Sequence, residues 1–361
     1  MLYAPLLSSL IDTGCGILAK RLVNPLGSSC PRIRAALAVS ICSPVISGTS
    51  DCSSRTLLSG ESLPHQLNDI FYLTSATKLI TTIAALQAID DAHLSLDSPE
   101  TISQFAPELV NKPILSPDGA TLTPPTNRIT LRQLLSHTSG LAYHFLHPYL
   151  SAWLEKNQEP CYNLPSPGSV SGRNKPLQPG HRRPVEEAFA YPLIFEPGTS
   201  WSYGPNLDWT GRILERATNT TLGQHVQERI CKPIGITAQD AQFYPVEGDE
   251  PRSRMVDLNP SDPAGLGLAV VGGTMDTNRR SEGDFGGHGM FMSAEGYIKV
   301  LRSLLANDGK LLRKETMEEM FRDLIGAEGE ENARGCLIVL LESSTWLGRR
   351  GSRLDMGWAG C

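Results

Sequence analysis

The sequence has 361 residues, of which 40% are hydrophobic, and a formal net charge of −6. A chain of this length can bury a sizeable core, so it needs neither disulfides nor a structural metal to fold. Basic residues form no stripe, which argues against a nucleic-acid partner. Apolar runs stay shorter than the roughly 20 residues that cross a bilayer, so no membrane partner is expected.

The N-terminus and the cysteines indicate the compartment. Residues 1–26 lack a basic start before their first apolar run, and Asp12 interrupts that run, so they are not expected to be a signal peptide. The eight cysteines are scattered without a Cys-x-x-Cys pair. Free thiols and a cytoplasmic location are therefore predicted.

The first half of the chain contains two predicted helices. Residues 35–47 are predicted to form one or two short buried strands. Residues 71–91 predict a helix, because Leu79, Ile83 and Leu86 fall on one face of a 3.6-residue period. Residues 129–141 predict a short helix that begins after an N-cap at Thr130 and ends at Gly140.

The second half alternates loops with helices. Residues 155–186 and 245–283 are rich in Pro and Gly and are predicted to be long loops. Residues 207–230, 293–306 and 314–324 have helical periodicity, with Ser293 near the start of the second segment. Residues 336–341 are apolar and predict a buried strand.

Several common kinds of site are absent from the sequence. It has no phosphate-binding loop, no dinucleotide-binding glycine motif and no Gly-x-Ser-x-Gly elbow. Zinc motifs are also missing, and His144 and His147 have no carboxylate close by in the sequence. We therefore expect neither a metal nor a cofactor.

The remaining chemical signal is Ser75-Ala76-Thr77-Lys78, at the start of the first strong helix. Residues three apart on a helix share a face. A serine hydroxyl becomes a good nucleophile only when a base takes its proton. A desolvated lysine near the positive end of the helix dipole could lose its own proton and serve as that base. The motif alone also fits a solvent-facing helix start, because such tetrads are common by chance.

Four segments together resemble one superfamily. Residues 74–87, 129–141, 197–203 and 285–291 are similar, in this order, to landmarks of the serine β-lactamases and penicillin-binding proteins, in their class C and esterase branch. Residues 141–148 and 203–211 more narrowly resemble the fungal polyketide transesterases. The resemblance runs from about residue 66 to residue 315, with the two loops as gaps.

This resemblance implies an α/β fold of the α+β type. An antiparallel sheet flanked by helices would form one lobe from residues 1–72 and 284–361, and residues 73–283 would form a mainly helical lobe of the same catalytic domain. Residues 349–352 resemble the lead into a core strand, and the sequence ends at Cys361 soon after it. We therefore expect the C-terminal strands of the sheet to be incomplete.

The resemblance also implies the catalytic groups. Ser75 would form the acyl ester, and Lys78 and Tyr203 would share the acid and base work, which leaves open which of the two takes the serine proton. The oxyanion would be bound by the N–H groups of Ser75 and of a late glycine-rich strand at Gly360.

Further residues are candidates for substrate contact. Pro205 stands where the class C branch has asparagine, so the adjacent Asn206 is the candidate there, and Trp209 has a core position as its alternative. His137 and Ser139 are expected to be structural. The candidates for lining the substrate site are Tyr72, Phe145, His147, Asn206, Trp209, His288 and Trp358.

The implied function is acyl transfer. The acyl group would come from a thioester donor, such as the carrier protein of a polyketide synthase, and would pass through an acyl-serine to the hydroxyl of a small-molecule secondary metabolite. An esterase or β-lactamase-like hydrolase of the same fold is the first alternative, because water can replace the alcohol. A truncated, inactive homologue is the second.

Overall fold

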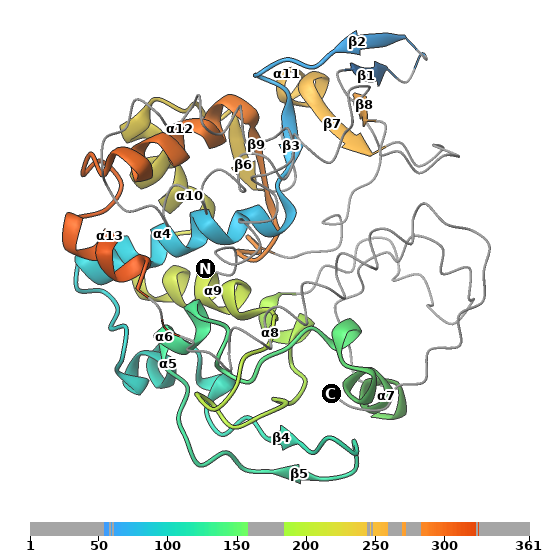
Figure 1. Ribbon diagram of the computed structural model, residues 1–361, viewed down its shortest axis with the longest axis vertical. Coiled ribbons are helices and arrows are strands. Elements are labelled where there is room, and N and C mark those ends of the chain that lie inside the picture. The colour runs from blue at the N-terminus through green and yellow to red at the C-terminus, as the bar shows by residue number, and fades with distance from the viewer. Residues whose placement is uncertain are drawn as a thin grey trace, which may run out of the picture.

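The computed structural model describes residues 54–57, 59, 61–157, 184–243, 246, 248–258, 269–271, 283–322 and 324. Within these residues, the strands form a seven-stranded sheet of order β2-β1-β8-β7-β3-β9-β6 and a separate hairpin, β4–β5 (Figure 1). The strands are β1 (Ser54–Leu57), β2 (Ser62–Pro64), β3 (Ile70–Tyr72), β4 (Ile114–Leu115), β5 (Leu122–Thr123), β6 (Ala241–Phe243), β7 (Met255–Leu258), β8 (Ala269–Val271) and β9 (Met290–Ser293).

The sheet is mixed, whereas the sequence predicts an antiparallel one. Strand β9 pairs antiparallel with β3 and with β6. Two other pairs, β1–β8 and β3–β7, are parallel. Parallel neighbours need a long crossover, and the chain between β3 and β7 supplies one because it contains most of the helices. The predicted combination of sheet and helices is confirmed, with this difference in strand direction.

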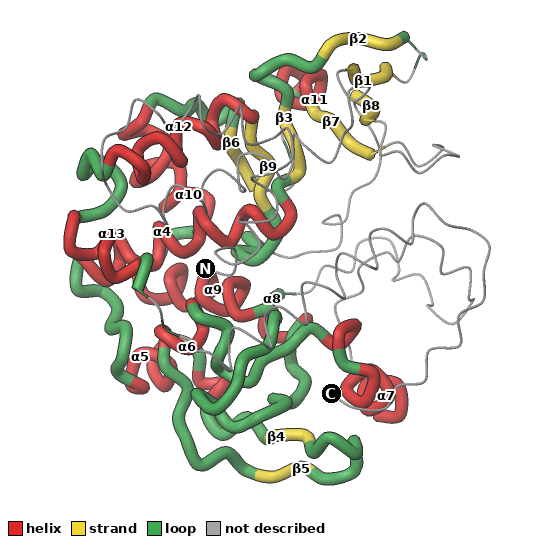
Figure 2. Tube along the Cα trace, viewed as in Figure 1, coloured by secondary structure: helices red, strands yellow, loops and turns green. Residues whose placement is uncertain are grey.

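Most of the helices lie to one side of the sheet, and long loops and the β4–β5 hairpin make up much of the remaining described molecule (Figure 2). The α-helices are α4 (Thr77–Asp90), α5 (Pro99–Phe105), α6 (Leu131–Leu135), α7 (Pro148–Asn157), α8 (Val185–Ala188), α9 (Asn206–Thr218), α10 (Leu222–Val226), α11 (Asp249–Arg254), α12 (Ala294–Ala306) and α13 (Lys314–Met320). Short 3₁₀ turns lie at η1 (Thr74–Ala76), η2 (Pro107–Leu109), η3 (His144–Leu146) and η5 (Lys232–Ile234), and η4 (Gln227–Cys231) is a π-helix.

The helix predicted over 71–91 begins later than expected. Residues up to Tyr72 belong to β3, which pairs with β7 and β9, so hydrogen bonds to distant strands override the local helical pattern. After the turn η1, α4 begins at Thr77. This places Ser75 at the junction of a strand and a helix.

Helix starts are predicted better than helix ends. Thr130 caps α6 with a hydrogen bond from the N–H of Gln133, and Ser293 caps α12 in the same way. However, α6 ends at Leu135 and not at Gly140, because the backbone already turns at His137, whose φ is 61°. The segment predicted as helix over 207–230 divides into α9, α10 and η4.

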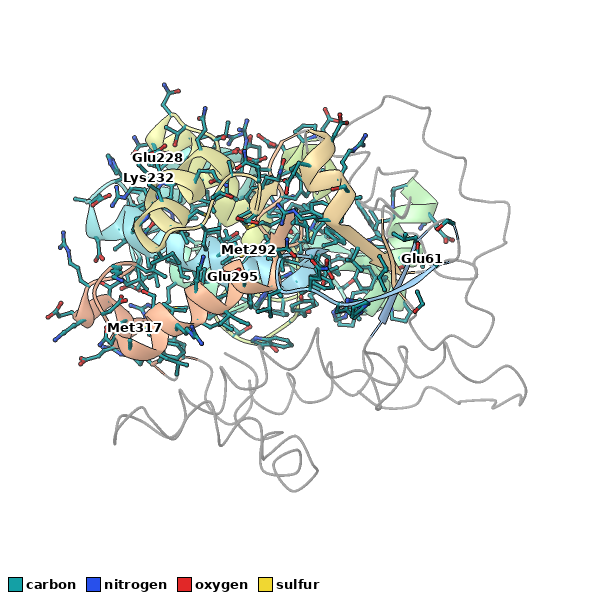
Figure 3. All side chains as sticks on the ribbon, turned by 90° about the horizontal axis from the view of Figure 1, so that it is seen from above. Glu61, Glu228, Lys232, Met292, Glu295 and Met317 are labelled. Carbon is teal, nitrogen blue, oxygen red and sulfur yellow. The ribbon has the colours of Figure 1, made fainter. Side chains whose placement is uncertain are left out.

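Helix α4 lies at the centre of the core. Ile80, Ile83 and Ala84 have no exposed surface, and α4 packs against α9, α10 and α13. A helix enclosed on most sides is apolar on most sides, which explains why most residues of α4 after Lys78 are apolar. By contrast, Figure 3 shows Glu228 and Lys232 together at the outer surface.

The loop predicted over 245–283 is wrong in part. The segment contains α11, β7 and β8. These short elements lie among Pro and Gly residues, and the strands are stabilised by hydrogen bonds to other strands of the sheet, so the local sequence does not reveal them. Of the loop predicted over 155–186, residues 158–183 lie outside the described residues, as do the strands predicted over 35–47 and 336–341 and the chain end.

Across the described ranges, none of the helices combines the length and apolar character needed to cross a bilayer.

Candidate active site

Ser75 is exposed at the strand-to-helix junction. The N–H of Leu73 bonds the carbonyl of Met290 at 2.9 Å, which ties the end of β3 to β9. Thr74 then turns the chain with a φ of 46°. Positive φ is strained for a β-branched residue. The turn presents the Ser75 side chain on the surface, where a substrate can reach it.

Tyr203 is the hydrogen-bonding partner of Ser75. Its hydroxyl donates to Oγ of Ser75 at 2.6 Å. The backbone around it is anchored on both sides, since the N–H of Ser202 bonds the carbonyl of His137 at 3.0 Å and the N–H of Tyr143 bonds the carbonyl of Tyr203 at 3.1 Å. The phenol is therefore held in reach of the serine proton.

Lys78 is directed towards a backbone carbonyl and two aromatic rings. Its Nζ donates to the carbonyl of Gly287 at 2.8 Å and to the hydroxyl of Tyr143 at 3.5 Å. It also lies 4.7 Å from the centre of the Tyr203 ring, within the range of a cation–π contact. Tyr203 thus hydrogen-bonds Ser75 directly, whereas Lys78 lies over the ring of Tyr203.

Tyr143, Tyr203 and Lys78 form a cluster, of which only Lys78 and Tyr203 were predicted from the sequence. Tyr143 and Asp208 were not among the predicted site residues, although both lie in the segments that resemble the transesterases. The hydroxyl of Tyr143 donates to Oδ2 of Asp208 at 3.4 Å. The sequence signal for Asp208 is a carboxylate in the first turn of α9. Such a residue also occurs wherever a negative charge stabilises the positive end of a helix dipole, so the signal is not specific.

Three predicted substrate contacts lie on partly exposed side chains. Phe145 is 42% exposed and its ring stacks on Tyr143 at 5.1 Å. Nε2 of His147 is 2.9 Å from Oγ of Ser202, next to Tyr203. Tyr72 is half-buried and its ring packs 4.9 Å from that of Phe291. Phe145 and His147 therefore lie near Tyr203, and Tyr72 lies on the strand that leads to Ser75.

Asn206 and Trp209 are corrections to the predicted substrate contacts. Asn206 has no exposed surface, and its amide contacts Nδ1 of His137 at 2.9 Å, the carbonyl of Leu141 at 3.3 Å and the hydroxyl of Ser139. Trp209 is likewise fully buried in the main core. Both lie on α9, whose first turns enter the core, so neither side chain is accessible to a substrate.

His288 is buried beside the cluster and does not face open solvent. Its Nδ1 lies 3.3 Å from Oδ1 of Asp208, and its ring packs on that of Phe285. Two other predicted residues, Trp358 and the oxyanion donor Gly360, lie outside the described residues.

The histidines near Tyr203 are uncharged at neutral pH. Burial, and after it the positive charge of Lys78, holds the pKa of His137 well below its usual range. Burial also lowers the pKa of His144 to about 4 and lowers that of His147. The uncharged His137 accepts a hydrogen bond at Nδ1 from the amide of Asn206. This bond supports the loop that carries Tyr203.

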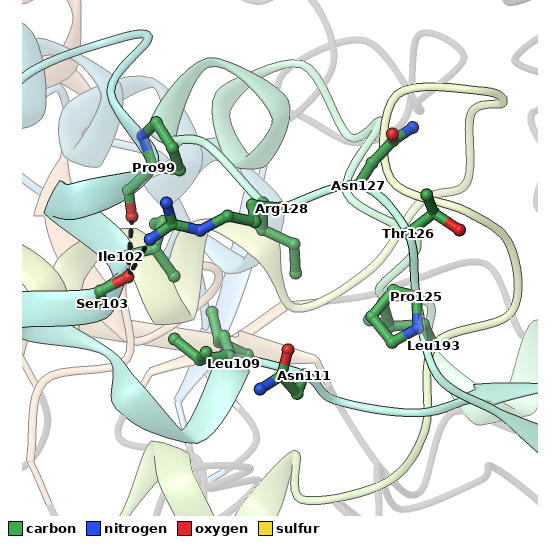
Figure 4. A pocket seen from close by; sticks show the side chains of 12 residues that line it. Pro99, Ile102, Ser103, Leu109, Asn111, Pro125, Thr126, Asn127, Arg128 and Leu193 are labelled. Atoms are coloured by element: carbon green, nitrogen blue, oxygen red, sulfur yellow. Dashed lines mark hydrogen bonds between the residues drawn. The ribbon is translucent and has the colours of Figure 1, made fainter.

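A hollow elsewhere in the described residues does not include Ser75, Lys78 or Tyr203. It has a volume of about 50 Å³ and is lined by α5, by residues 109–111 at the end of η2, by the 125–129 segment and by Leu193, with Ile102, Asn111 and Arg128 among its side chains (Figure 4). A guanidinium nitrogen of Arg128 donates to Ser103 at 2.6 Å across its edge. No Ser75, Lys78 or Tyr203 atom lines it, and within the described ranges no cluster of three potential metal ligands occurs.

Comparisons with known proteins find relatives over most of the chain. A lovastatin esterase from Penicillium rubens is 49% identical over 287 residues, which cover 78% of this chain and 67% of that protein. A monacolin J acid methylbutanoyltransferase from Aspergillus terreus is 36% identical and covers 74% of this chain and 60% of its own length. The chain thus spans about 60–67% of the length of these relatives.

A solved structure is similar to the described fold. Simvastatin synthase (LovD) from Aspergillus terreus, in its unliganded selenomethionyl form, matches with a TM-score of 0.61 and 34% identity. The match covers 78% of this chain and 65% of that one. The model of the Beta-lactamase family matches residues 54–335. The chain, in which Tyr203 contacts both Ser75 and Lys78, belongs to the beta-lactamase family of enzymes.

Proposed function

We propose that this chain is a serine esterase that removes an acyl group from an ester of a polyketide alcohol. The observation that carries the proposal is the 2.6 Å hydrogen bond between Tyr203 and Ser75, with Lys78 behind the phenol ring. The substrate class is suggested by the lovastatin esterase, which is 49% identical. Hydrolysis, the first alternative of the sequence analysis, therefore takes precedence over acyl transfer.

The geometry suggests a two-step reaction. The first step requires Tyr203 to have released its proton to solvent, so that its oxygen accepts from Ser75. Oγ of Ser75 then attacks the ester carbonyl while its proton passes to the oxygen of Tyr203. Tyr203 then gives that proton to the leaving alcohol, and the acyl group remains on Ser75. In the second step, water attacks the acyl ester while Tyr203 takes one proton from that water, and Tyr203 then passes this proton to Oγ of Ser75 as the bond between Oγ and the acyl carbon breaks. The products are the free alcohol and a carboxylic acid.

Lys78 would act through its charge. An ammonium group 4.7 Å from the Tyr203 ring stabilises the negative charge that this mechanism places on the phenol oxygen. Because Nζ also donates to the carbonyl of Gly287, it is held in place without contacting the serine. The N–H of Ser75 is proposed as one donor to the oxyanion, and Gly360 stays a prediction for the other.

Acyl transfer is the second candidate, because a methylbutanoyltransferase is 36% identical. The acyl-serine would be the same, and a metabolite hydroxyl would replace water in the second step. The predicted acyl donor, a thioester that a carrier protein could present, stays a prediction. The two functions differ only in how the acyl-serine partitions between water and alcohol.

The test uses the full chain with lovastatin and, separately, with a thioester of a short branched acid. Intact-protein mass spectrometry measures the acyl adduct, and chromatography measures released acid and any new ester when an acceptor alcohol is added. We expect an adduct on Ser75 and released acid, both lost in Ser75→Ala but retained in the matched control Ser95→Ala. New ester in excess of acid would favour transfer. An absence of adduct and of product with every ester would overturn both functions.

A further inference from the structure

We infer that Asp208 is a positioning residue for Lys78: it holds both hydrogen-bond acceptors of the Lys78 ammonium and supplies the negative charge that balances it. The inference rests on the proposed function, since it assigns a task within that catalytic site. Asp208 lies in the first turn of α9 and has no exposed surface.

The two hydrogen-bond acceptors of Lys78 also contact Asp208. Nζ of Lys78 donates to the carbonyl of Gly287 at 2.8 Å, and Oδ1 of Asp208 accepts from the N–H of the same residue at 2.8 Å. The hydroxyl of Tyr143 accepts from Lys78 at 3.5 Å and donates to Oδ2 of Asp208 at 3.4 Å. The carboxylate and the ammonium are thus joined by one residue's backbone and by one hydroxyl.

The charge of Asp208 strengthens these links. A buried carboxylate is costly unless hydrogen bonds and a positive charge compensate it. The N–H of Gly287 and the hydroxyl of Tyr143 supply hydrogen bonds, and Nδ1 of His288 lies 3.3 Å from Oδ1. Hydrogen bonds in a chain polarise one another, so the hydroxyl of Tyr143 becomes a better acceptor for the Lys78 ammonium when it donates to the Asp208 carboxylate.

The packing leaves little freedom in this arrangement. A Cβ on Gly287 would lie 2.3 Å from Oδ2 of Asp208, so the carboxylate rests directly against the glycine backbone. The preceding carbonyl, that of Gly286, accepts from Oγ1 of Thr81 at 2.7 Å. The Gly286–Gly287 turn is therefore held between α4, which carries Lys78, and α9, which carries Asp208.

The consequence concerns where the ammonium points. With its acceptors fixed, Lys78 is kept over the ring of Tyr203, at 4.7 Å from the ring centre. Without the charge of Asp208, the same acceptors would bind the ammonium more weakly, and the stabilisation of the Tyr203 phenolate would decrease. Asp208 itself contacts neither Ser75 nor, in this geometry, the reacting atoms.

The first experiment compares Asp208→Asn with a matched Asp284→Asn variant in the full chain. Asn keeps the shape and removes the charge, and Asp284 bonds the N–H of Gly223 in a similar way but makes no contact with Lys78. For lovastatin hydrolysis we expect kcat to fall by about 10–100-fold in D208N, with KM changed by less than about 3-fold. D284N should keep the wild-type kcat.

A second measurement does not depend on turnover. Acetic anhydride modifies only uncharged amines, and peptide mass spectrometry gives the extent of modification of Lys78 relative to that of Lys112, which is also buried. We expect this ratio to rise in D208N and to stay unchanged in D284N, because only D208N loses the charge that balances the ammonium.

The outcomes separate this inference from the proposed function. Wild-type protein without esterase activity would overturn the proposed function, while the modification ratio would still test Asp208. Equal kcat and an equal ratio in wild type and D208N would overturn the role of Asp208. If D208N does not fold, Tyr143→Phe removes one of the two links, and an unchanged ratio and kcat in that variant would count against the inference.

Discussion

The hydroxyl of Tyr203 donates a hydrogen bond of 2.6 Å to Oγ of Ser75, although 128 positions separate the two residues in the sequence. The tyrosine comes from the loop before α9 and the serine from the turn before α4, and these two helices pack against each other. The contact between Tyr203 and Ser75 therefore depends on the packing of the two helices that follow these residues.

Removing the hydroxyl of Tyr203 tests its role as the acid and base. In Tyr203→Phe we expect kcat/KM for ester hydrolysis to fall by about 10²–10⁴-fold, which is the usual contribution of such a group. The rate of acyl-adduct formation on Ser75 measures the effect on the first step. Tyr149→Phe, which removes the hydroxyl of a half-buried tyrosine on α7, is the control. A loss of less than about 3-fold in Y203F would contradict this role.

The glycine after Tyr203 is required by close backbone packing. A Cβ at Gly204 would lie 2.4 Å from the carbonyl oxygen of Leu141 and 2.7 Å from Cα of Ala142. Gly204→Ala should therefore lower the free energy of unfolding by about 2 kcal/mol and reduce activity by moving Tyr203. Urea unfolding and the esterase assay measure the two effects.

A second glycine serves as the control for this substitution. A Cβ at Gly211 meets mainly the end of the Leu222 side chain, at 2.9 Å, and this end can move. Gly211→Ala also gains helix propensity, so its free energy of unfolding should stay within about 1 kcal/mol of wild type. Equal losses in G204A and G211A would argue against a special role for the Gly204 contact.

Lys112 stabilises a turn next to the site. It is only 7% exposed, and its Nζ donates to the carbonyls of Phe189, Ala190 and Tyr191 at 3.4, 2.7 and 3.1 Å. Lys112→Met leaves these acceptors without that donor, and we expect the free energy of unfolding to fall by about 3 kcal/mol.

An exposed lysine provides the comparison. Lys232 pairs with Glu228 at 2.9 Å on the surface, and such pairs contribute little (Figure 3). Lys232→Met should change the free energy of unfolding by less than about 0.5 kcal/mol. Urea unfolding at neutral pH measures both variants, and a K112M value as small as that of K232M would refute the stabilising role of Lys112.

His225 makes the fold sensitive to acid. Burial, and after it the charge of Arg229, lowers the pKa of His225 from its usual 6.5 to about 4. Between these values the unfolded chain binds the proton more tightly than the folded chain, so stability is lost as the pH falls through this window. The contribution of this residue to the loss between about pH 7 and about pH 5 is about 2 kcal/mol.

His225→Gln tests this contribution. A glutamine can still donate to Oε1 of Gln87, which Nε2 of His225 contacts at 3.2 Å, but it does not titrate. We expect the loss of unfolding free energy between about pH 7 and about pH 5 to be smaller in the variant by about 2 kcal/mol. The comparison uses the difference between the two pH values, so a uniform change in stability does not affect it. Identical acid sensitivity in both proteins would show that His225 does not titrate in this window.

Local patterns in the sequence were sufficient for much of the helical structure. Helix α12 and its Ser293 cap follow from amphipathic periodicity and from capping chemistry, both of which involve residues within a few positions of one another. The start of α4 was predicted too early because Ile70–Tyr72 acquire strand partners from β7 and β9. Pairings of this kind involve segments far apart in the chain, so a local pattern does not report them.

The sequence by itself determined the family and named Ser75, Lys78 and Tyr203, because their motifs are short and specific residue types are needed for the chemistry. Only the tertiary structure decided which of these side chains meet. The bond of Lys78 to Gly287 spans 209 positions, and it depends on how α4 and α9 pack around a glycine turn. The same packing buried Asn206 and Trp209 in the core and brought Asp208 to the site, since which residues of α9 lie inside depends on the elements packed around the helix as well as on its own pattern.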